Sequence, residues 1–175
     1  VRSEEKFGKH IEELLISPLP NWVILGGYVT GALTRGLLVG AVVMAVSLFF
    51  TRSEVQHPLV MLSVRVLTAA VFALAGMVNA IFAQKFDDIA IIPTFVLAPL
   101  TYLGGVFYSI SLLPEFWQNV SVFNPILYMV NGFRLGMLGT SDVSLGMTYG
   151  VIISAGVLLF TWCMILLHRG TGLRS

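Results

Sequence analysis

An uncharged run of about twenty residues, interrupted by two prolines, most constrains what this chain can fold into. The run follows the polar residues 85–88, extends to about residue 110 and contains Pro93 and Pro99. Twenty apolar residues, rising 1.5 Å each along a helix, cross a hydrocarbon core of about 30 Å. A soluble helix of this length needs a polar face, which this run lacks. It therefore predicts a membrane span over 89–112 that is kinked at its prolines.

The composition of the whole chain agrees with a membrane protein. Hydrophobic residues make up 57% of the 175 positions and charged residues 11%, whereas a soluble globular domain carries about 25% charged residues. A net charge of +1, without a basic patch, excludes nucleic acid as a partner. Cys163 is the only cysteine, so an internal disulfide and a thiolate metal cage are excluded. We expect Cys163 to pack in a helix as a small apolar residue.

Long apolar runs predict an all-α polytopic membrane protein in which 1–175 form a single membrane domain. Trp22 marks a membrane interface before the first run. The four predicted transmembrane helices are 23–50, 58–83, 89–112 and 147–167.

The segment 113–146 does not fit the spanning pattern. Its apolar part, 126–138, is too short to cross a bilayer and carries Arg134, so we expect a re-entrant segment. Asn124 and Pro125 form a turn or a helix start, with proline at the first helical position. Gly139 and Asp142 end the run.

The most strongly charged stretch, 3–17, predicts a short amphipathic helix at the membrane surface. Its apolar residues repeat with helical spacing, and Pro18 and Pro20 stop it before it is long enough to span. Two interpretations remain open, an interfacial anchor and a docking element for a soluble partner. Anionic lipid would repel its carboxylates, which favours the partner. These carboxylates belong to Glu4, Glu5, Glu12 and Glu13.

Loop charges predict the orientation. If both chain ends face the cytoplasm, the inner side carries six basic residues and the outer side only Arg52 and Arg134, as the positive-inside rule favours. Residues 3–17 are then cytoplasmic and 113–146 external. The six inner basic residues are Arg2, Lys6, Lys9, Lys85, Arg169 and Arg174.

Two arginines and two pairs of glycines stand out inside the predicted spans. A charge at the bilayer centre costs on the order of 2.5–3.5 kcal/mol, so Arg35 and Arg65 should face protein or water. The pairs 27/31 and 36/40 have the small-xxx-small spacing that lets helices approach closely, within the chain or in a homodimer.

The chemistry of catalysis and of ion coupling is missing from the sequence. His10, His57 and His168 lie in separate polar segments without ligand spacing, so we predict no metal site. No nucleophile–base set and no phosphate-binding loop is present, and we predict no enzyme. The predicted spans hold no Asp, Glu or His that could carry a coupling proton, so the energy for transport must come from elsewhere.

Eight short motifs follow one another along nearly all 175 residues. They are Ile11-Glu-Glu-Leu-Leu-Ile-Ser-Pro-Leu-Pro20, Phe86-Asp-Asp-Ile, Pro93-Thr-Phe-Val-Leu, Pro99-Leu-Thr-Tyr-Leu-Gly-Gly-Val-Phe-Tyr-Ser109, Leu113-Pro-x-Phe-Trp117, Asn124-Pro-Ile-x-Tyr-Met129, Gly132-Phe-Arg134 and Arg169-Gly-x-Gly-Leu-Arg-Ser175. These motifs are weak singly but specific together. In this order they resemble the permease subunit of type-2 ABC exporters, and more closely the YadH-like inner-membrane permeases of bacteria.

The resemblance implies a role for each part. Residues 3–17 are expected to be the coupling helix that docks on an ABC ATPase subunit, and 113–139 the external re-entrant helices. The partner would bind ATP and magnesium, so this chain needs no cofactor of its own. The family has six spans after a connector helix, which implies that the first two spans are absent from this chain. The residues expected to contact the ATPase are Glu12, Glu13, Leu14 and Leu15, and those expected to line the translocation path are Phe95, Leu100, Phe107 and Tyr108.

The resemblance further implies a bacterial inner-membrane protein that works as a homodimer and exports a substrate by alternating access. Two interpretations from other classes stay open. One is a channel or scaffold without a motor. The other is a membrane enzyme, for which only Glu115 and Asp142 are available in the external segment. The sequence does not define the substrate.

Overall fold

A computed structural model describes residues 20–50, 55–83, 86–107 and 110–169 of the chain. These residues form helices and no strand. Three helices are long and apolar enough to cross a membrane by length and composition. The prediction of an all-α membrane protein built on long apolar helices is therefore confirmed. The three helices are α2 (Asn21–Phe50), α3 (Pro58–Phe82) and α8 (Leu145–Arg169).

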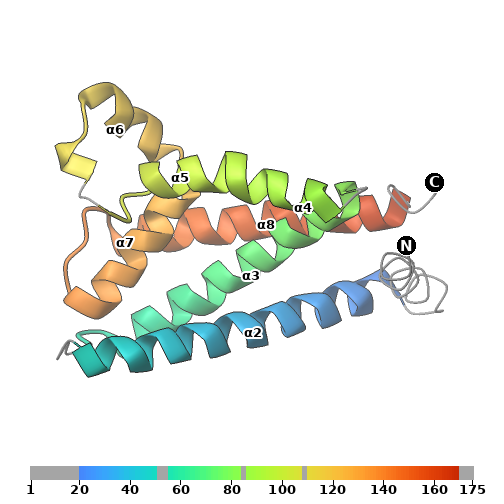
Figure 1. Cartoon of the computed structure of the whole chain (residues 1–175), viewed down its shortest axis with the longest axis horizontal. Helices are drawn as coiled ribbons and strands as arrows, with labels where there is room; N and C mark the ends of the chain where they lie inside the picture. Colours follow the sequence, from blue (N-terminus) through green and yellow to red (C-terminus); the bar gives the residue numbers. More distant parts are fainter. Residues whose placement is uncertain (1–19, 51–54, 84–85, 108–109, 170–175) are drawn as a thin grey trace.

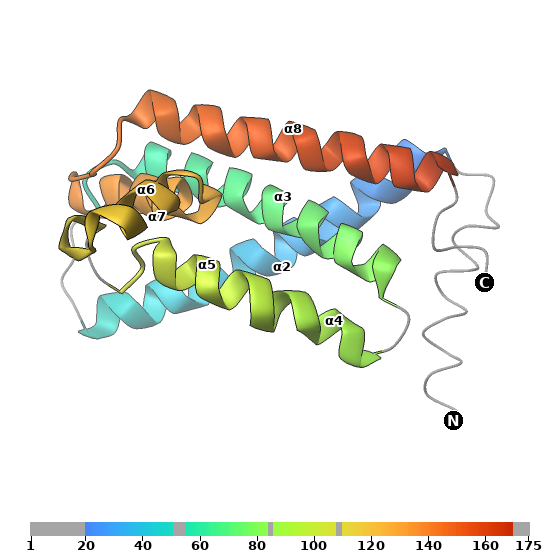
Figure 2. The ribbon, with the colours of Figure 1, turned by 90° about the horizontal axis from the view of Figure 1, so that it is seen from above.

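The fourth predicted span is a shorter helical rod, seen beside α3 in Figure 2. It consists of α4 (Phe86–Ile92), a π-helical turn η1 (Pro93–Leu97) and α5 (Ala98–Leu103). The rod ends at Leu103 rather than at residue 112, because the chain turns at Gly104 and Gly105, where φ reaches 73° at Gly105. A left-handed φ is readily adopted only by glycine, so this pair terminates the helix.

Three short helices occupy the segment that the sequence predicted to be re-entrant. They are η2 (Ile110–Leu112, a 3₁₀ turn), α6 (Glu115–Val122) and α7 (Pro125–Leu138). The predicted start of α7 is confirmed, since Asn124 accepts a hydrogen bond from the Ile126 N–H at 3.0 Å and Pro125 follows it. Gly139 ends the helix in the left-handed conformation, with φ 71°.

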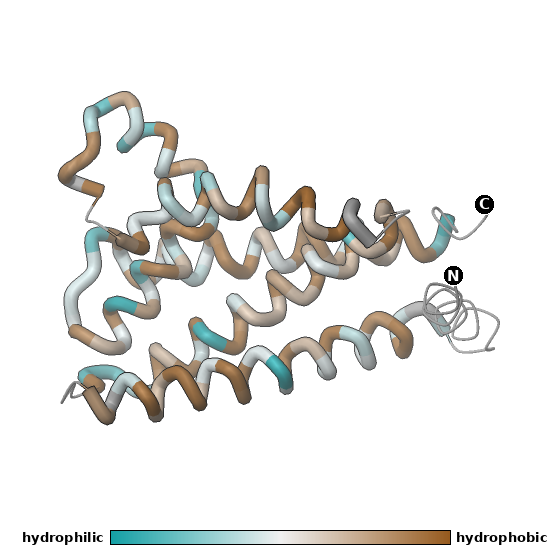
Figure 3. Tube along the Cα trace, in the orientation of Figure 1, coloured by the Kyte–Doolittle hydropathy of each residue, from teal (hydrophilic) through white to brown (hydrophobic). Residues whose placement is uncertain are grey.

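Helix α3 is the central helix, packed against α2, α7 and α8. α2 begins, and α3 and α8 end, at one end of the molecule, and α6 and α7 lie at the opposite end (Figure 1). Figure 3 shows that hydrophilic positions are sparse along α2, α3 and α8. α2 is the most exposed of the long helices and buries only Leu25 among its large hydrophobic side chains.

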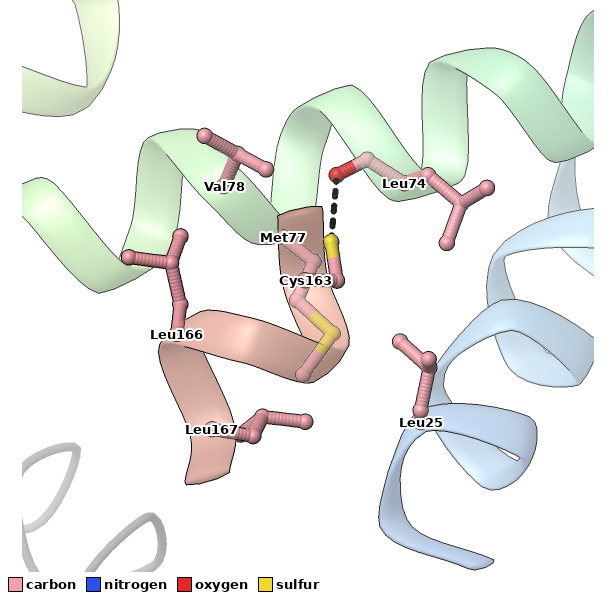
Figure 4. Close-up of a cluster of buried hydrophobic side chains, with 7 residues drawn as sticks. All are labelled: Leu25, Leu74, Met77, Val78, Cys163, Leu166 and Leu167. Carbon is pink, nitrogen blue, oxygen red and sulfur yellow. Dashed lines mark hydrogen bonds between the residues drawn. The ribbon is translucent and has the colours of Figure 1, made fainter. Parts of the chain in front are cut away.

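The two buried apolar clusters both centre on α3. The cluster shown in Figure 4 joins α2, α3 and α8 near the end where α2 begins. Cys163 is fully buried in it, and its Sγ lies 3.6 Å from the Leu74 carbonyl oxygen, so the packing role predicted for this cysteine is confirmed. The second cluster joins α3, α7 and α8 through Val64, Val71, Met129 and Ile152.

Glycines allow α3 and α7 to cross at very short range. A Cβ built on Gly136 would lie 2.7 Å from the Met61 Cα, and one on Gly132 would lie 3.0 Å from a Val64 methyl carbon. The backbones also pair directly, since the His57 N–H donates to the Gly136 carbonyl at 2.9 Å. The first turn of α3 is thus fixed to the last turn of α7.

Candidate functional site

The rod α4–η1–α5 contains the two prolines of the uncharged run, Pro93 in η1 and Pro99 in α5. Pro93 has no N–H to donate to the Ile89 carbonyl, so a regular α-helix is interrupted there. The Ala98 N–H bonds instead to the Pro93 carbonyl five residues earlier, which makes η1 a π-turn. π-Turns inside α-helices are frequent at functional sites. The predicted kink thus takes the form of one widened turn in a continuous rod.

Asn79 of α3 supplies the donor that Pro93 lacks. Its side chain is 8% exposed, and its Nδ2 donates to the Ile89 carbonyl oxygen at 2.9 Å. Inside a membrane an unpaired carbonyl is costly, so this bond stabilises the break in the helix. The sequence contained a signal for this contact, because a buried amide in an apolar run needs a partner, but its partner could not be deduced from the sequence.

A second asparagine side chain, that of Asn124, caps a carbonyl at the other end of the rod. The Gly104 N–H bonds to the Thr101 carbonyl at 3.2 Å, so the Leu100 carbonyl is not capped by the backbone of Gly104. Asn124, at the start of α7, donates to that oxygen from Nδ2 at 2.6 Å. The same asparagine caps α7, and it is only 3% exposed.

Arg134 of α7 holds the loop that follows α5. One guanidinium nitrogen donates to the Gly105 carbonyl at 3.0 Å, and the other lies 3.1 Å from a carboxylate oxygen of Asp142. Since Asn131 accepts the Asp142 N–H at 3.1 Å, the turn after α7 is bound back to the same helix. The ion pair of Arg134 with Asp142 therefore has a structural role, as is common for arginines in membrane proteins.

The structure places three of the four predicted path-lining residues on or near this rod. Phe95 is 73% exposed and Phe107 is 69% exposed, whereas Leu100 is partly buried beside α7. The Phe107 ring lies 5.4 Å from the exposed ring of Tyr102, which the sequence analysis did not single out. Tyr108 lies outside the described residues. An exposed aromatic surface without a partner among the described residues is therefore present, and its lining role stays a prediction.

The two arginines inside the long helices have different surroundings. Arg65 of α3 is half-buried, and one of its terminal nitrogens donates to the Leu37 carbonyl of α2 at 3.1 Å. Gly40 makes room for it, since a Cβ there would overlap the guanidinium. Arg35 lies exposed on α2. Neither forms an ion pair with the described residues. Arg65 faces protein, as expected; Arg35 has no protein partner within the described part of the chain.

The two glycine pairs of α2 also differ. Gly36 and Gly40 face α3, where a Cβ on Gly36 would lie 3.6 Å from the Ala69 side chain. Gly27 and Gly31 have no atom within 4 Å of such a Cβ. The pair 36/40 serves packing within the chain, and the pair 27/31 lies on an open face of the helix.

The predicted ATPase contacts cannot be placed. Glu12, Glu13, Leu14 and Leu15 lie outside the described residues, as does the whole segment 3–17. Glu115 and Asp142, the pair considered for an enzyme, are both exposed. Asp142 is bound to Arg134, and within the described residues no cluster of His, Cys, Asp or Glu could hold a metal ion.

Comparison with known proteins defines the class. The model of the ABC-2 type transporter family matches residues 4–138, and the chain belongs to this family. With its long apolar helices it is a multi-pass membrane protein.

The chain is also similar to individual proteins over most of its length. The chain is 54% identical to the inner membrane transport permease YadH of Escherichia coli K12 over 170 residues, which are 97% of this chain and 66% of that protein. It is 27% identical to nodulation protein J of Rhizobium leguminosarum bv. viciae over 158 residues, covering 90% of this chain and 61% of that protein. No solved structure matches it. The chain thus spans slightly less than two thirds of the curated relatives it matches.

Proposed function

We propose that this chain forms the transmembrane path of an ABC exporter and is driven by ATP hydrolysis in a separate ATPase subunit. The observation that carries this proposal is the 54% identity to an inner membrane transport permease over 97% of the chain. The long apolar helices and the lack of a coupling carboxylate in the predicted spans support it. The chain is not an enzyme in this scheme, and ATP and magnesium bind to the partner.

Four spans are proposed: α2, α3, the rod α4–η1–α5, and α8. The ends of the chain face the cytoplasm of a bacterium, and α6 and α7 form an external re-entrant segment in the inner membrane. The arrangement supports this orientation, because α6 and α7 lie at the end opposite to the start of α2 and the end of α8 (Figure 1). The excess of basic residues on the proposed inner side supports it as well.

Coupling is assigned to residues 3–17. We expect Glu12, Glu13, Leu14 and Leu15 to contact the ATPase, because carboxylates on a cytoplasmic amphipathic helix suit a protein surface better than anionic lipid. Two copies of the permease would enclose the path, with the exposed aromatic surface of the rod as one wall. The open face at Gly27 and Gly31 supports a further helix contact outside this chain.

Charge reversal on the coupling helix tests this function. The double variant E12K/E13K should lower the amount of ATPase that copurifies by roughly tenfold or more, since misplaced charges at an interface cost several kcal/mol. The control is E115K, a single Glu-to-Lys reversal on an exposed residue at the start of α6. Both variants should keep the helical content and the detergent-solubilised yield of the unmodified protein.

Two results would contradict the proposal. Full copurification and full ATP-driven export by E12K/E13K would show that coupling lies elsewhere. If the unmodified chain retains no ATPase under any condition, a channel or scaffold without a motor is the better description.

A further inference from the structure

Arg35 is the one charged residue of α2, and it lies halfway along this helix. It is 14 residues from Asn21 and 15 from Phe50, so at 1.5 Å per residue it is about 21–22 Å from either end. Arginines reach the headgroups from positions near the ends of a span. If α2 crosses the bilayer, as proposed, Arg35 therefore lies near the midplane, about 15 Å from the headgroups on each side.

The side chain of Arg35 lies on the open side of α2. It is exposed and makes no hydrogen bond or ion pair with the described residues. Gly31 is one turn earlier on the same face, and no atom lies within 4 Å of a Cβ built on it. Since helical side chains lean towards the N-terminal end of their helix, Arg35 leans over Gly31. Its guanidinium therefore has free space beside it in the described part of the chain.

Arg65 of α3 shows the contrasting arrangement at a similar depth. Its guanidinium lies against the side of α2 that faces α3, where it donates to the Leu37 carbonyl at 3.1 Å and occupies the space beside Gly40. Leu37 is only two residues from Arg35. The middle of α2 thus has two guanidinium groups close to it, of which one is bound within the protein and the other is open.

The chain supplies no negative group at the depth of Arg35. The predicted spans contain no Asp or Glu, so a second copy packed against this face would bring another Arg35 and no acid. Lipid phosphates lie at the membrane surface, about 15 Å away. Arginine stays protonated, and a charge at the bilayer centre is costly unless it faces water or a partner. The counter-charge must therefore come from a different molecule.

We propose that Arg35 binds the anionic group of the exported substrate, and that this substrate is an amphiphile with a phosphate or carboxylate group. The inference rests on the proposed function, because transport is what brings an anion to the middle of a membrane. A guanidinium matches the oxygens of either group with parallel hydrogen bonds, and a positive charge in a path favours anions over cations. Leu38 and Val42, each 63% exposed on the same face, provide apolar surface for the hydrocarbon part.

The test uses the complex of the permease with its ATPase, purified in dodecyl maltoside. Dodecyl phosphate and dodecyltrimethylammonium, which share the alkyl tail of this detergent and differ in charge, are titrated in turn. A ligand of the folded state raises the unfolding temperature, and we expect only dodecyl phosphate to do so. The half-saturating concentration should rise roughly tenfold in R35Q, as for loss of a charged hydrogen bond. It should rise less in R35K, which keeps the charge without the paired donors.

R169Q is the matched control, since it makes the same charge change at an exposed residue in the last turn of α8. Its response to dodecyl phosphate should equal that of the unmodified protein. Equal half-saturating concentrations in R35Q and R169Q would overturn the proposal. Equal stabilisation by the anionic and the cationic probe would overturn it as well.

The unfolding temperature without any probe separates a ligand from a protein partner. R35Q should then unfold at the same temperature as the unmodified protein or higher, because it removes an unpaired charge from an apolar helix. A lower temperature would mean that Arg35 pairs with an acidic residue of another subunit, which would overturn the proposal. Retention of the ATPase is measured in the same samples. Its absence from the unmodified complex would contradict the proposed function, whereas its retention without a response that depends on Arg35 would contradict only the anionic substrate.

Discussion

Helix α7 and the rod α4–η1–α5 are attached to the rest of the molecule by different means: α7 packs along α3, whereas the rod contacts α3 through α4 and α7 through α5. α7 is fitted to α3 by shape, because Gly136 lies against the backbone of Met61 and Gly132, one turn earlier, lies against the Val64 side chain. Seven of the fourteen residues of α7 are buried. Neither η1 nor α5 buries any residue, and the rod is bound through single hydrogen bonds from Asn79 and Asn124 to its carbonyls.

The difference indicates which element can move. A close-packed crossing has one arrangement, because any displacement creates voids or overlaps. A rod held at two points by side-chain amides can tilt or shift once one bond breaks. If the rod lines the path, as proposed, its loose attachment suits alternating access, and the tight pair α3–α7 provides the fixed frame.

The largest effect is expected from alanine at Gly136. The new Cβ would lie 2.6 Å from the Met61 Cβ and 2.8 Å from its backbone nitrogen, so the helices must separate. Overpacking costs about 1–3 kcal/mol and occasionally more. Because the overlap here is with backbone atoms, we expect a cost at or above the upper end of this range, well above the gain of about 0.5–1 kcal/mol for replacing glycine in a helix. G136A should therefore lower the free energy of unfolding, measured by denaturant titration in detergent.

Gly150 of α8 provides the control, since nothing lies within 4 Å of a Cβ built there. G150A should be neutral or stabilising by about 0.5–1 kcal/mol, as expected for glycine replaced in an open helix position. If G150A were as destabilising as G136A, the contrast between a close-packed crossing and an open face would be wrong.

The sequence predicted the long helices well, because their signal is local. Apolar runs predicted helices over 58–83 and 147–167, and the structure has Pro58–Phe82 and Leu145–Arg169. The limits of α7 followed from residues that act on their own backbone, Pro125 at the start and Gly139 at the end. The predicted end of the rod, residue 112, is wrong, because the uncharged run continues past Gly104 and Gly105 and its hydropathy gives no sign of the turn there.

The polar contacts of the site could not be predicted, because each joins residues that are remote in sequence. In the sequence, Asn79 is a polar residue near the end of an apolar run, and its bond to Ile89 depends on how α4 lies against α3. The same applies to Arg65, whose partner on α2 is a backbone carbonyl and whose space is left by Gly40. A backbone carbonyl that accepts a hydrogen bond, or the space left beside a glycine, cannot be recognised from the sequence pattern.

A smaller effect is expected at Asn79, and a second substitution should relieve it. N79L removes the donor to the Ile89 carbonyl and should cost about 1–3 kcal/mol, the penalty for leaving a buried acceptor unpaired. P93A restores a backbone N–H four residues after Ile89, so N79L should cost less in the P93A background. A double-mutant cycle on the free energy of unfolding measures this coupling. Additive costs would mean that Asn79 does not replace the donor lost at Pro93.

The smallest effect is expected at Arg134, which binds the loop after α5. D142N should change the free energy of unfolding by about 0–1 kcal/mol, because the Asp142 side chain is 48% exposed and an exposed ion pair contributes little. R134Q removes the same ion pair and also the donor to the Gly105 carbonyl, so it should cost about 1 kcal/mol more.

Salt separates the two contributions of Arg134. Raising the ionic strength screens an exposed ion pair, so the difference between the unmodified protein and D142N should shrink. The difference between D142N and R134Q should persist, because a hydrogen bond to a carbonyl depends less on screening. If D142N were as destabilising as R134Q at high salt, the bond to Gly105 would contribute nothing, and the far end of the rod would be held by Asn124 and by the contact of Gly104 with Ile126. Asn124 alone would then supply the side-chain hydrogen bond at the outer end of the rod, as Asn79 does at its inner end.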